Sequence, residues 1–184
     1  MHAKRNIGWW FDRPSDLPGW LRISLTIVAP VTFFGVIIGA WFGARAVDRL
    51  IGVEQPIAPV IGWVLACPFL VVGLALMFWS VSRFVLARGT PVPFNPPPTL
   101  VTTGPYRYTR HPMFTGLIIA IFGLGIGFQS PAVTFILLPL TIAAFAWEVR
   151  VFEEPQLQRR FGDAYLEYQK RVPMIFPRIK KNGL

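Results

Sequence analysis

Three uncharged and mostly apolar runs dominate the chain, at residues 23–44, 55–82 and 112–147. The first run would be about 33 Å long as a helix, which is enough to cross a bilayer core of about 30 Å. The second run is longer and suits a tilted span with interfacial ends. The first two runs therefore predict two transmembrane helices without ionisable side chains at depth, which act as scaffold or as the wall of an apolar tunnel.

The third run is too long for a single crossing, and Gln129-Ser130-Pro131 interrupts it in the middle. We expect a hairpin of two short helices, at about residues 113–128 and 132–147. Each arm alone would cover only about 24 Å. The second arm must therefore continue through Glu148 and Arg150 before it leaves the membrane.

The charges are placed as the topology of a membrane protein requires. The chain has 18 Lys and Arg against 9 Asp and Glu, and the excess lies in the N-terminal segment, after the second run and after the third run. The positive-inside rule then predicts four spans with both termini in the cytoplasm. The predicted fold is an all-α integral membrane protein with a cytoplasmic C-terminal amphipathic helix. Residues 1–22 would be a cytoplasmic interfacial segment, 23–87 two spans, and 88–184 the half that holds the loop, the helical hairpin and the C-terminal helix.

Composition excludes several other classes. With 53% hydrophobic and 15% charged residues, the chain is not an ordinary soluble enzyme. The net charge of +9 comes without a nucleic-acid recognition motif, so we expect no nucleic-acid partner. One cysteine, Cys67, and two histidines argue against a metal site. Neither a dinucleotide fingerprint nor a serine nucleophile elbow is present.

Polar chemistry gathers in two segments that flank the predicted hairpin, the loop 88–111 and the tail from Glu148 onward. Both would lie on the cytoplasmic face, so the ends of the hairpin should bring them together. Pro112 suits the first turn of a helix, which places Arg110 and His111 at a helix N-terminus that favours an anion. The alternative is that Arg107 and Arg110 only bind lipid headgroups.

The tail combines acidic residues with an aromatic face. Glu148, at membrane depth, would be functional or paired. Arg150 and Glu154 are four residues apart, so a simple helical ion pair is the alternative. Pro155 should end or kink the helix. The residues after it recur at helical spacing and form one apolar face, either of a surface helix or of a lid over a cytoplasmic pocket; they are Leu157, Phe161, Tyr165 and Tyr168.

At these residues the sequence resembles the isoprenylcysteine carboxyl methyltransferase and phospholipid methyltransferase family of integral-membrane enzymes. The ordered elements are Gly104-Pro105-Tyr106-Arg107-Tyr108, Arg110-His111-Pro112-Met113-Phe114, Glu153-Glu154, Phe161-Gly162 and Arg171-Val172-Pro173. The resemblance covers about residues 100–177. Two departures are Phe114, where the family usually has Tyr, and Pro155, where an aliphatic residue is common.

The resemblance implies S-adenosylmethionine as the methyl donor and a lipophilic acceptor that enters from the bilayer. It implies that Arg110 and Glu154 are catalytic. Donor-binding residues would be Tyr106, Arg107, His111, Pro112, Phe114, Gly116, Glu153, Leu157, Tyr165 and Tyr168. Acceptor-binding residues would be Glu148, Arg150 and Arg171.

The acceptor is left open between two chemistries. A carboxylate of an isoprenylcysteine-like substrate is already ionised and needs only orientation, for example by Arg110. A phosphatidylethanolamine amine must first lose a proton, so Glu154 or His111 would serve as base. The alternatives from other classes are an NADPH-dependent membrane reductase and a non-catalytic lipid-binding protein.

Overall fold

The computed structural model describes residues 18–54, 56–89 and 97–175, and every regular element within these ranges is helical. The α-helices, in chain order, are α2 (Gly19–Leu50), α3 (Pro59–Leu86), α4 (Pro112–Gly127), α5 (Leu138–Glu148), α6 (Glu154–Phe161) and α7 (Asp163–Arg171). A 3-10 turn (Gly104–Arg107) precedes α4, and π-helical turns (Val133–Leu137 and Val149–Glu153) precede α5 and α6. The interfacial role predicted for residues 1–22 falls mostly outside the described residues.

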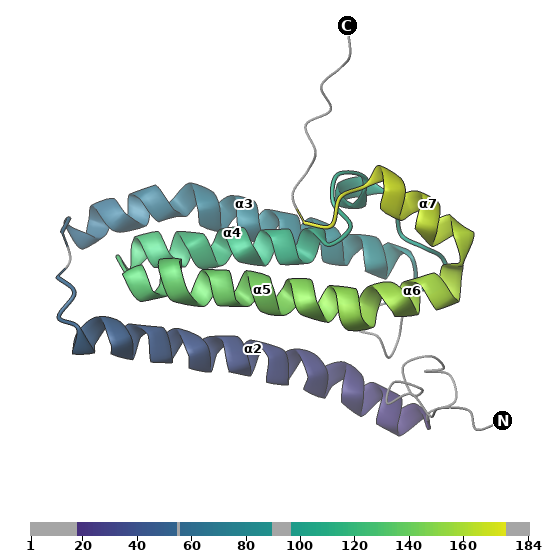
Figure 1. Ribbon diagram of the computed structural model, residues 1–184, viewed down its shortest axis with the longest axis horizontal. Coiled ribbons are helices and arrows are strands. Elements are labelled where there is room, and N and C mark those ends of the chain that lie inside the picture. Colours follow the sequence, from purple (N-terminus) through teal and green to yellow (C-terminus); the bar gives the residue numbers. More distant parts are fainter. Residues whose placement is uncertain (1–17, 55, 90–96, 176–184) are drawn as a thin grey trace, which may run out of the picture.

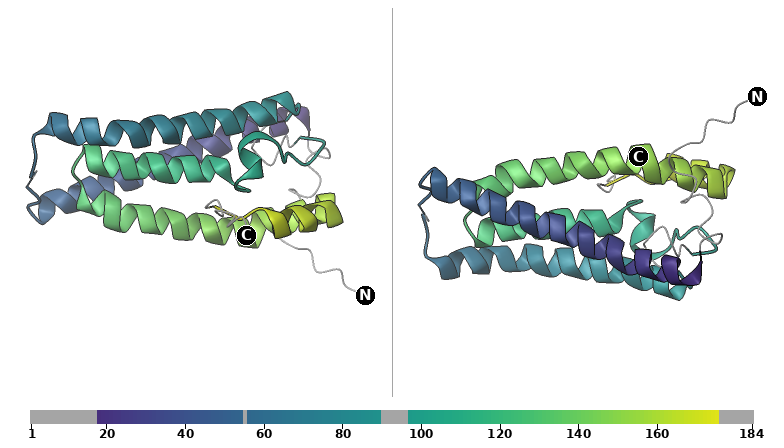
Figure 2. Two further views of the ribbon diagram at one scale, coloured as in Figure 1. Left: turned by 90° about the horizontal axis from the view of Figure 1, so that it is seen from above. Right: turned by 90° about the horizontal axis from the view of Figure 1, so that it is seen from below.

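The predicted membrane fold is confirmed. Among the described residues, three helical segments are long and apolar enough to cross a membrane, Val31–Leu50, Pro59–Leu86 and Val133–Phe161, and α4 is a shorter apolar helix. The hairpin has α4 as its first arm, and its second arm continues beyond Glu148 as predicted. Figure 2 shows α4 between α3 and α5, with α2 crossing one face of these three helices. The side of the membrane on which each end lies stays a prediction.

Glycines allow α3 and α4 to approach each other closely. A Cβ atom built on Gly73 would lie 2.6 Å from the carbonyl oxygen of Gly116, and the reverse distance is also 2.6 Å. Only residues without a side chain fit such a contact, which is a common way for helices to pack in a membrane. This contact fixes α4, and therefore the residues just before it, relative to α3.

The tip of the hairpin is tied to the end of α2 by Asp48, which is only 3% exposed. Its carboxylate accepts hydrogen bonds from the Ser130 hydroxyl and, at 3.0 Å, from the Ala132 N–H. Arg45 lies 3.6 Å from the same carboxylate. Asp48 thus caps the second arm of the hairpin from another helix and satisfies amide groups that a helix start leaves free.

Proline changes the winding of the second arm without ending it. Pro155 lies in the first turn of α6, directly after the π-helical turn Val149–Glu153, and the helical path continues to Phe161. A proline lacks an N–H and clashes with the preceding turn, and a wider turn ahead of it accommodates both effects. Of the two outcomes expected for Pro155, an end or a kink of the helix, the end is therefore wrong. The wider turn also changes the alignment of Arg150 and Glu154. Glu154 pairs with Arg110 instead.

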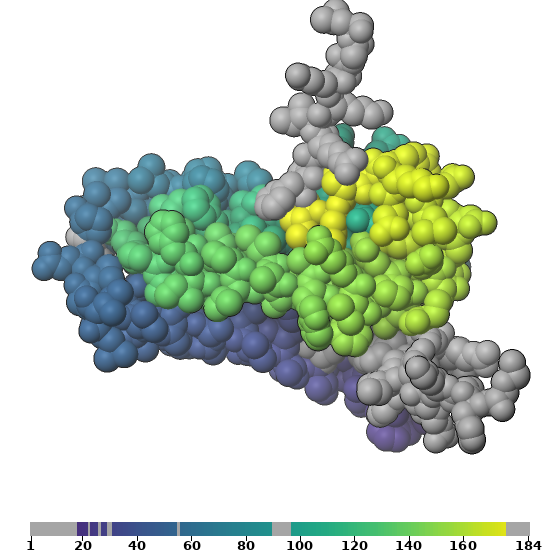
Figure 3. All heavy atoms as spheres, in the orientation of Figure 1, coloured from purple at the N-terminus to yellow at the C-terminus, as the bar shows by residue number. Residues whose placement is uncertain are grey.

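The tail was predicted to form one amphipathic helix, but it forms two. Gly162, with a φ of +55°, separates α6 from α7. The apolar face is nevertheless preserved. Tyr165, Tyr168 and Val172 form a buried cluster against which Leu157 and Phe161 pack. We call α6 and α7 the lid. Figures 1 and 3 show the lid at the end of the hairpin opposite its tip.

Candidate active site

An ion pair between the loop and the second arm forms the centre of the candidate site. Arg110 Nη1 lies 2.7 Å from Glu154 Oε1, and the two side chains are 9% and 14% exposed. Gln169 of α7 donates to the other carboxylate oxygen at 3.0 Å. The structure therefore brings together the two segments that the hairpin was expected to join. The attraction between the charges of a buried pair of this kind is strong because little water screens it.

A second contact between the loop and the second arm lies beside the first. His111 Nδ1 is 3.4 Å from Glu153 Oε2, and the imidazole is almost fully buried. Burial, and secondarily the charge of Arg110, lower the pKa of His111 to about 3. The imidazole is therefore neutral at neutral pH, and its contact with Glu153 is not an ion pair.

The cluster contains buried nitrogen atoms that are not satisfied. His111 Nε2 and Arg110 Nε have no hydrogen-bond partner within the described part of the chain. Buried polar groups are normally paired, so such atoms call for an explanation. A ligand with hydrogen-bonding groups would supply the missing partners.

Three buried tyrosines surround the cluster on the lid side. The Tyr168 hydroxyl donates to the backbone oxygen of Tyr106 at 2.7 Å. Burial raises the pKa of Tyr106, Tyr165 and Tyr168 well above its usual value, and for Tyr165 the charge of Glu154 acts in the same direction. All three hydroxyls therefore keep their protons at neutral pH. This side of the cluster is therefore lined by neutral aromatic groups.

An aromatic row leads from the cluster into the bundle. The His111 and Phe114 rings stack with centroids 5.8 Å apart, and Phe114 stacks on Phe145 of α5 at 4.0 Å. Phe145 in turn contacts Phe33 of α2 at 5.5 Å. Pro112 is fully buried at the start of α4. The side of the cluster that faces the bundle is therefore apolar.

Several predicted site residues lie apart from this cluster. Arg107, Arg150 and Arg171 are exposed, and Arg171 Nε donates to the Glu167 carbonyl. Gly116 faces Gly73 of α3. Leu157, in α6, packs against the buried cluster of Tyr165, Tyr168 and Val172, and Glu148 is half-buried in the second arm. Among the described residues, no hydrogen bond or ion pair joins these side chains to the Arg110–Glu154 pair.

Sequence reasoning missed three residues near the cluster. They are Gln169, which holds Glu154, and Thr109 and Thr115, whose hydroxyls donate to backbone carbonyls of the C-terminal segment. All are common polar residues without a distinctive spacing, so their partners could only be found in the fold. Within the described residues, no group of three or more His, Cys, Asp or Glu side chains could hold a metal ion.

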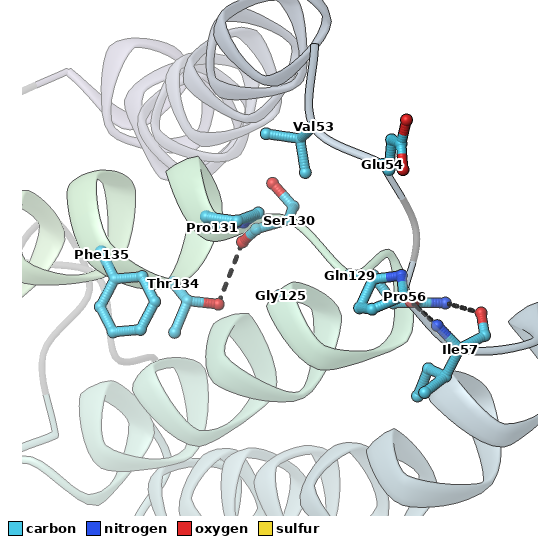
Figure 4. A pocket seen from close by; sticks show the side chains of 10 residues that line it. All are labelled: Val53, Glu54, Pro56, Ile57, Gly125, Gln129, Ser130, Pro131, Thr134 and Phe135. Atoms are coloured by element: carbon cyan, nitrogen blue, oxygen red, sulfur yellow. Dashed lines mark hydrogen bonds between the residues drawn. The ribbon is translucent and has the colours of Figure 1, made fainter. Parts of the chain in front are cut away.

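A shallow depression of about 330 Å³ lies at the other end of the molecule, beside the hairpin tip. Figure 4 shows its lining, in which Gln129 is paired with the backbone of Ile57 and Thr134 with that of Ser130. Its lining is mostly apolar and holds neither the Arg110–Glu154 pair nor His111. The candidate chemistry therefore lies away from this depression.

The fold and the site define a polytopic helical membrane protein that carries a buried acid–base cluster at one end of its hairpin. The family model described as phospholipid methyltransferase matches residues 61–164. The chain belongs to this family. No solved structure matches it.

Individual relatives match over a shorter stretch. The cobalt-zinc-cadmium resistance protein CzcN of Cupriavidus metallidurans is 40% identical over 81 residues, which are 44% of this chain and 37% of that protein. Methanethiol S-methyltransferase 2 of Bradyrhizobium diazoefficiens is 31% identical over 105 residues, 56% of this chain and 37% of that protein. Human protein-S-isoprenylcysteine O-methyltransferase is 38% identical over 82 residues, 45% of this chain and 28% of that protein. The matches thus span well under half of each of these relatives.

Proposed function

We propose that this protein is an S-adenosylmethionine-dependent membrane methyltransferase with a lipophilic acceptor. The observation that carries the proposal is the buried contact of Arg110 with Glu154, beside His111, at the lid end of the hairpin. Membership of the phospholipid methyltransferase family supports the reaction class. The positive charge near this end supports a cytoplasmic active site with both termini on the same side.

The residues of the cluster fit the proposed donor. The unpaired nitrogens of His111 and Arg110 are suited to bind its carboxylate, and Glu153 is suited to bind ribose hydroxyls. The aromatic groups of the lid and Phe114 are suited to its adenine and its apolar parts. When bound, S-adenosylmethionine supplies an electrophilic sulfonium methyl group.

For the acceptor we favour the carboxylate of an isoprenylcysteine-like molecule. Arg110 would orient this carboxylate through its guanidinium, while Glu154 and Gln169 hold Arg110 in place. The apolar row at Phe114 and Phe145 gives the acceptor chain a suitable surface. Burial of the cluster excludes water, which favours a reaction between an anionic acceptor and a cationic donor.

A phospholipid amine is the second candidate, because the matching family model is that of phospholipid methyltransferases. A protonated amine must be deprotonated before it attacks. The carboxylates of Glu153 and Glu154 and the neutral imidazole of His111 lie together and are the groups that could accept that proton.

A methyl-transfer assay with labelled S-adenosylmethionine and purified protein in lipid nanodiscs tests this function. We expect label in N-acetyl-farnesylcysteine and less or none in phosphatidylethanolamine. Label only in phosphatidylethanolamine would show that the acceptor is the amine and not the carboxylate. No transfer to either, combined with binding of NADPH, would favour a reductase. No binding of any of these molecules would leave a non-catalytic lipid-binding protein.

A further inference from the structure

Residues 172–175, which follow the lid, return to the start of α4. We call this segment the strap. The Arg110 N–H donates to the Pro173 carbonyl at 2.9 Å, and the His111 N–H donates to the Met174 carbonyl at 3.1 Å. The two amides that the sequence suggested for an anion are therefore taken by strap carbonyls, so a ligand must use the side chains of these residues.

Two buried hydroxyls hold the strap in this place. Thr109 Oγ1 donates to the Met174 carbonyl at 2.8 Å, and Thr115 Oγ1 donates to the Ile175 carbonyl at 2.7 Å. Thr109 is 2% exposed and Thr115 is 4% exposed. Water cannot easily reach these buried groups to replace their hydrogen bonds. The two contacts therefore hold the strap in place, one before Arg110 in the sequence and one after His111.

The strap also connects the lid to the loop that carries Arg110 and His111. Val172 belongs to the buried cluster of Tyr165 and Tyr168. The next residue, Pro173, accepts the hydrogen bond from Arg110. A displacement of the lid is therefore transmitted to the backbone of Arg110 and His111 through only a few bonds. Figure 1 shows the segment that follows α7, in yellow, running back from the lid toward the start of α4.

We propose that the strap is a positioning element of the donor site, with Thr109 and Thr115 as its positioning residues. It holds the Arg110 and His111 backbone so that their side chains meet Glu154 and Glu153. This inference rests on the proposed function, because the site that is positioned is the one assigned to S-adenosylmethionine.

The test compares Thr109→Val, Thr115→Val and the double variant with the native protein. Valine keeps the shape and removes the hydroxyl, so we expect the Kd for S-adenosylhomocysteine to rise by about fivefold for each bond removed. The KM for S-adenosylmethionine should rise with it. Thr109→Ser should restore the native Kd.

Thr141→Val is the matched control, because the Thr141 hydroxyl makes a bond of 2.8 Å to the Leu137 carbonyl within the second arm. It should leave the Kd unchanged. Unchanged Kd values in both single variants and in the double variant would overturn the proposal. Equal losses in the control and in the strap variants would show a general loss of stability and would overturn it as well.

Hydrogen–deuterium exchange separates this inference from the proposed function. The amides of Arg110 and His111 should be protected in the native protein and should exchange faster in Thr109→Val. Rapid exchange in the native protein would overturn the strap even if methyl transfer is found. A different result would separate the two ideas. If Thr109→Val loses this protection but the native protein does not bind S-adenosylhomocysteine, the proposed donor is overturned and the strap has only a structural role.

Discussion

The two ends of the hairpin each bury a carboxylate, but in different states. At the tip, Asp48 receives hydrogen bonds from Ser130 and from the Ala132 amide and lies near Arg45. At the lid end, Glu154 pairs with Arg110, while nitrogens of Arg110 and His111 are without partners within the described residues. A satisfied cluster holds the fold together, whereas an unsatisfied cluster is prepared for a ligand.

The contrast also explains why the shallow depression beside the tip is not the candidate site. Around the tip, Ser130 and the Ala132 amide are paired with Asp48, and Gln129 is paired with Ile57. At the lid end, buried nitrogens of Arg110 and His111 have no hydrogen-bond partner within the described residues. The predictions below are ordered by the size of the effect that distinguishes the two ends.

Arg110→Ala should have the largest effect. The change removes the group that orients the acceptor and leaves Glu154 buried without its cation, so methyl transfer should fall at least about a hundredfold. A labelled-methyl assay measures this. Arg88→Ala is the control, since Arg88 lies at the start of the same loop, is exposed and belongs to no predicted site. Full activity of Arg110→Ala would remove Arg110 from the mechanism.

Glu154→Gln should reduce methyl transfer by about ten- to a hundredfold, because the amide keeps the shape but cannot neutralise Arg110. Steady-state kinetics with both substrates measure the loss. Glu167→Gln, at an exposed position of α7, should leave the kinetics unchanged. If the two variants behave alike, the contact with Arg110 is only structural.

Asp48→Asn should produce the opposite pattern. It weakens the bonds to Ser130 and Ala132 and should lower the free energy of unfolding by about 1–3 kcal/mol, with no change in the Kd for S-adenosylhomocysteine. Thermal unfolding in detergent and calorimetry give the two quantities. Asp163→Asn, at an exposed position, is the control. A weaker Kd in Asp48→Asn would contradict the division between the two ends.

Mild acidification, from pH 7 to 5.5, should give the smallest effect. His111 has a pKa of about 3 in the folded protein and 6.5 as its ordinary value, so the unfolded chain takes up the proton first. The stability that His111 contributes is complete above about pH 6.5 and is lost as the pH falls toward 3, by at most about 1.4 kcal/mol per pH unit. Chemical unfolding at pH 7 and 5.5 measures it. A similar pH dependence in His111→Gln would exclude His111 as the cause.

Much of this architecture could be predicted from the sequence, because lipid imposes simple rules. The apolar runs specified the spans, and Gln129-Ser130-Pro131 specified the hairpin turn. The hairpin then required that the segments around Arg110 and Glu154 meet, and they do.

The features that were missed depend on tertiary contacts. The φ of Gly162 divides the lid into two helices, although the spacing of the aromatic residues fits one. Asp48 has no distinctive spacing in the sequence, and only the fold shows it capping the hairpin. Thr109 and Thr115 have no pattern that could reveal the strap. Such contacts join residues far apart in the sequence and have no periodicity.

Calorimetry of the purified protein with S-adenosylhomocysteine, and separately with NADPH, tests the central claim most directly. The account predicts saturable binding of S-adenosylhomocysteine at one site per chain, lost in Arg110→Ala and retained in Asp48→Asn, and no binding of NADPH. The absence of S-adenosylhomocysteine binding by folded protein, or equal binding by Arg110→Ala, would contradict it.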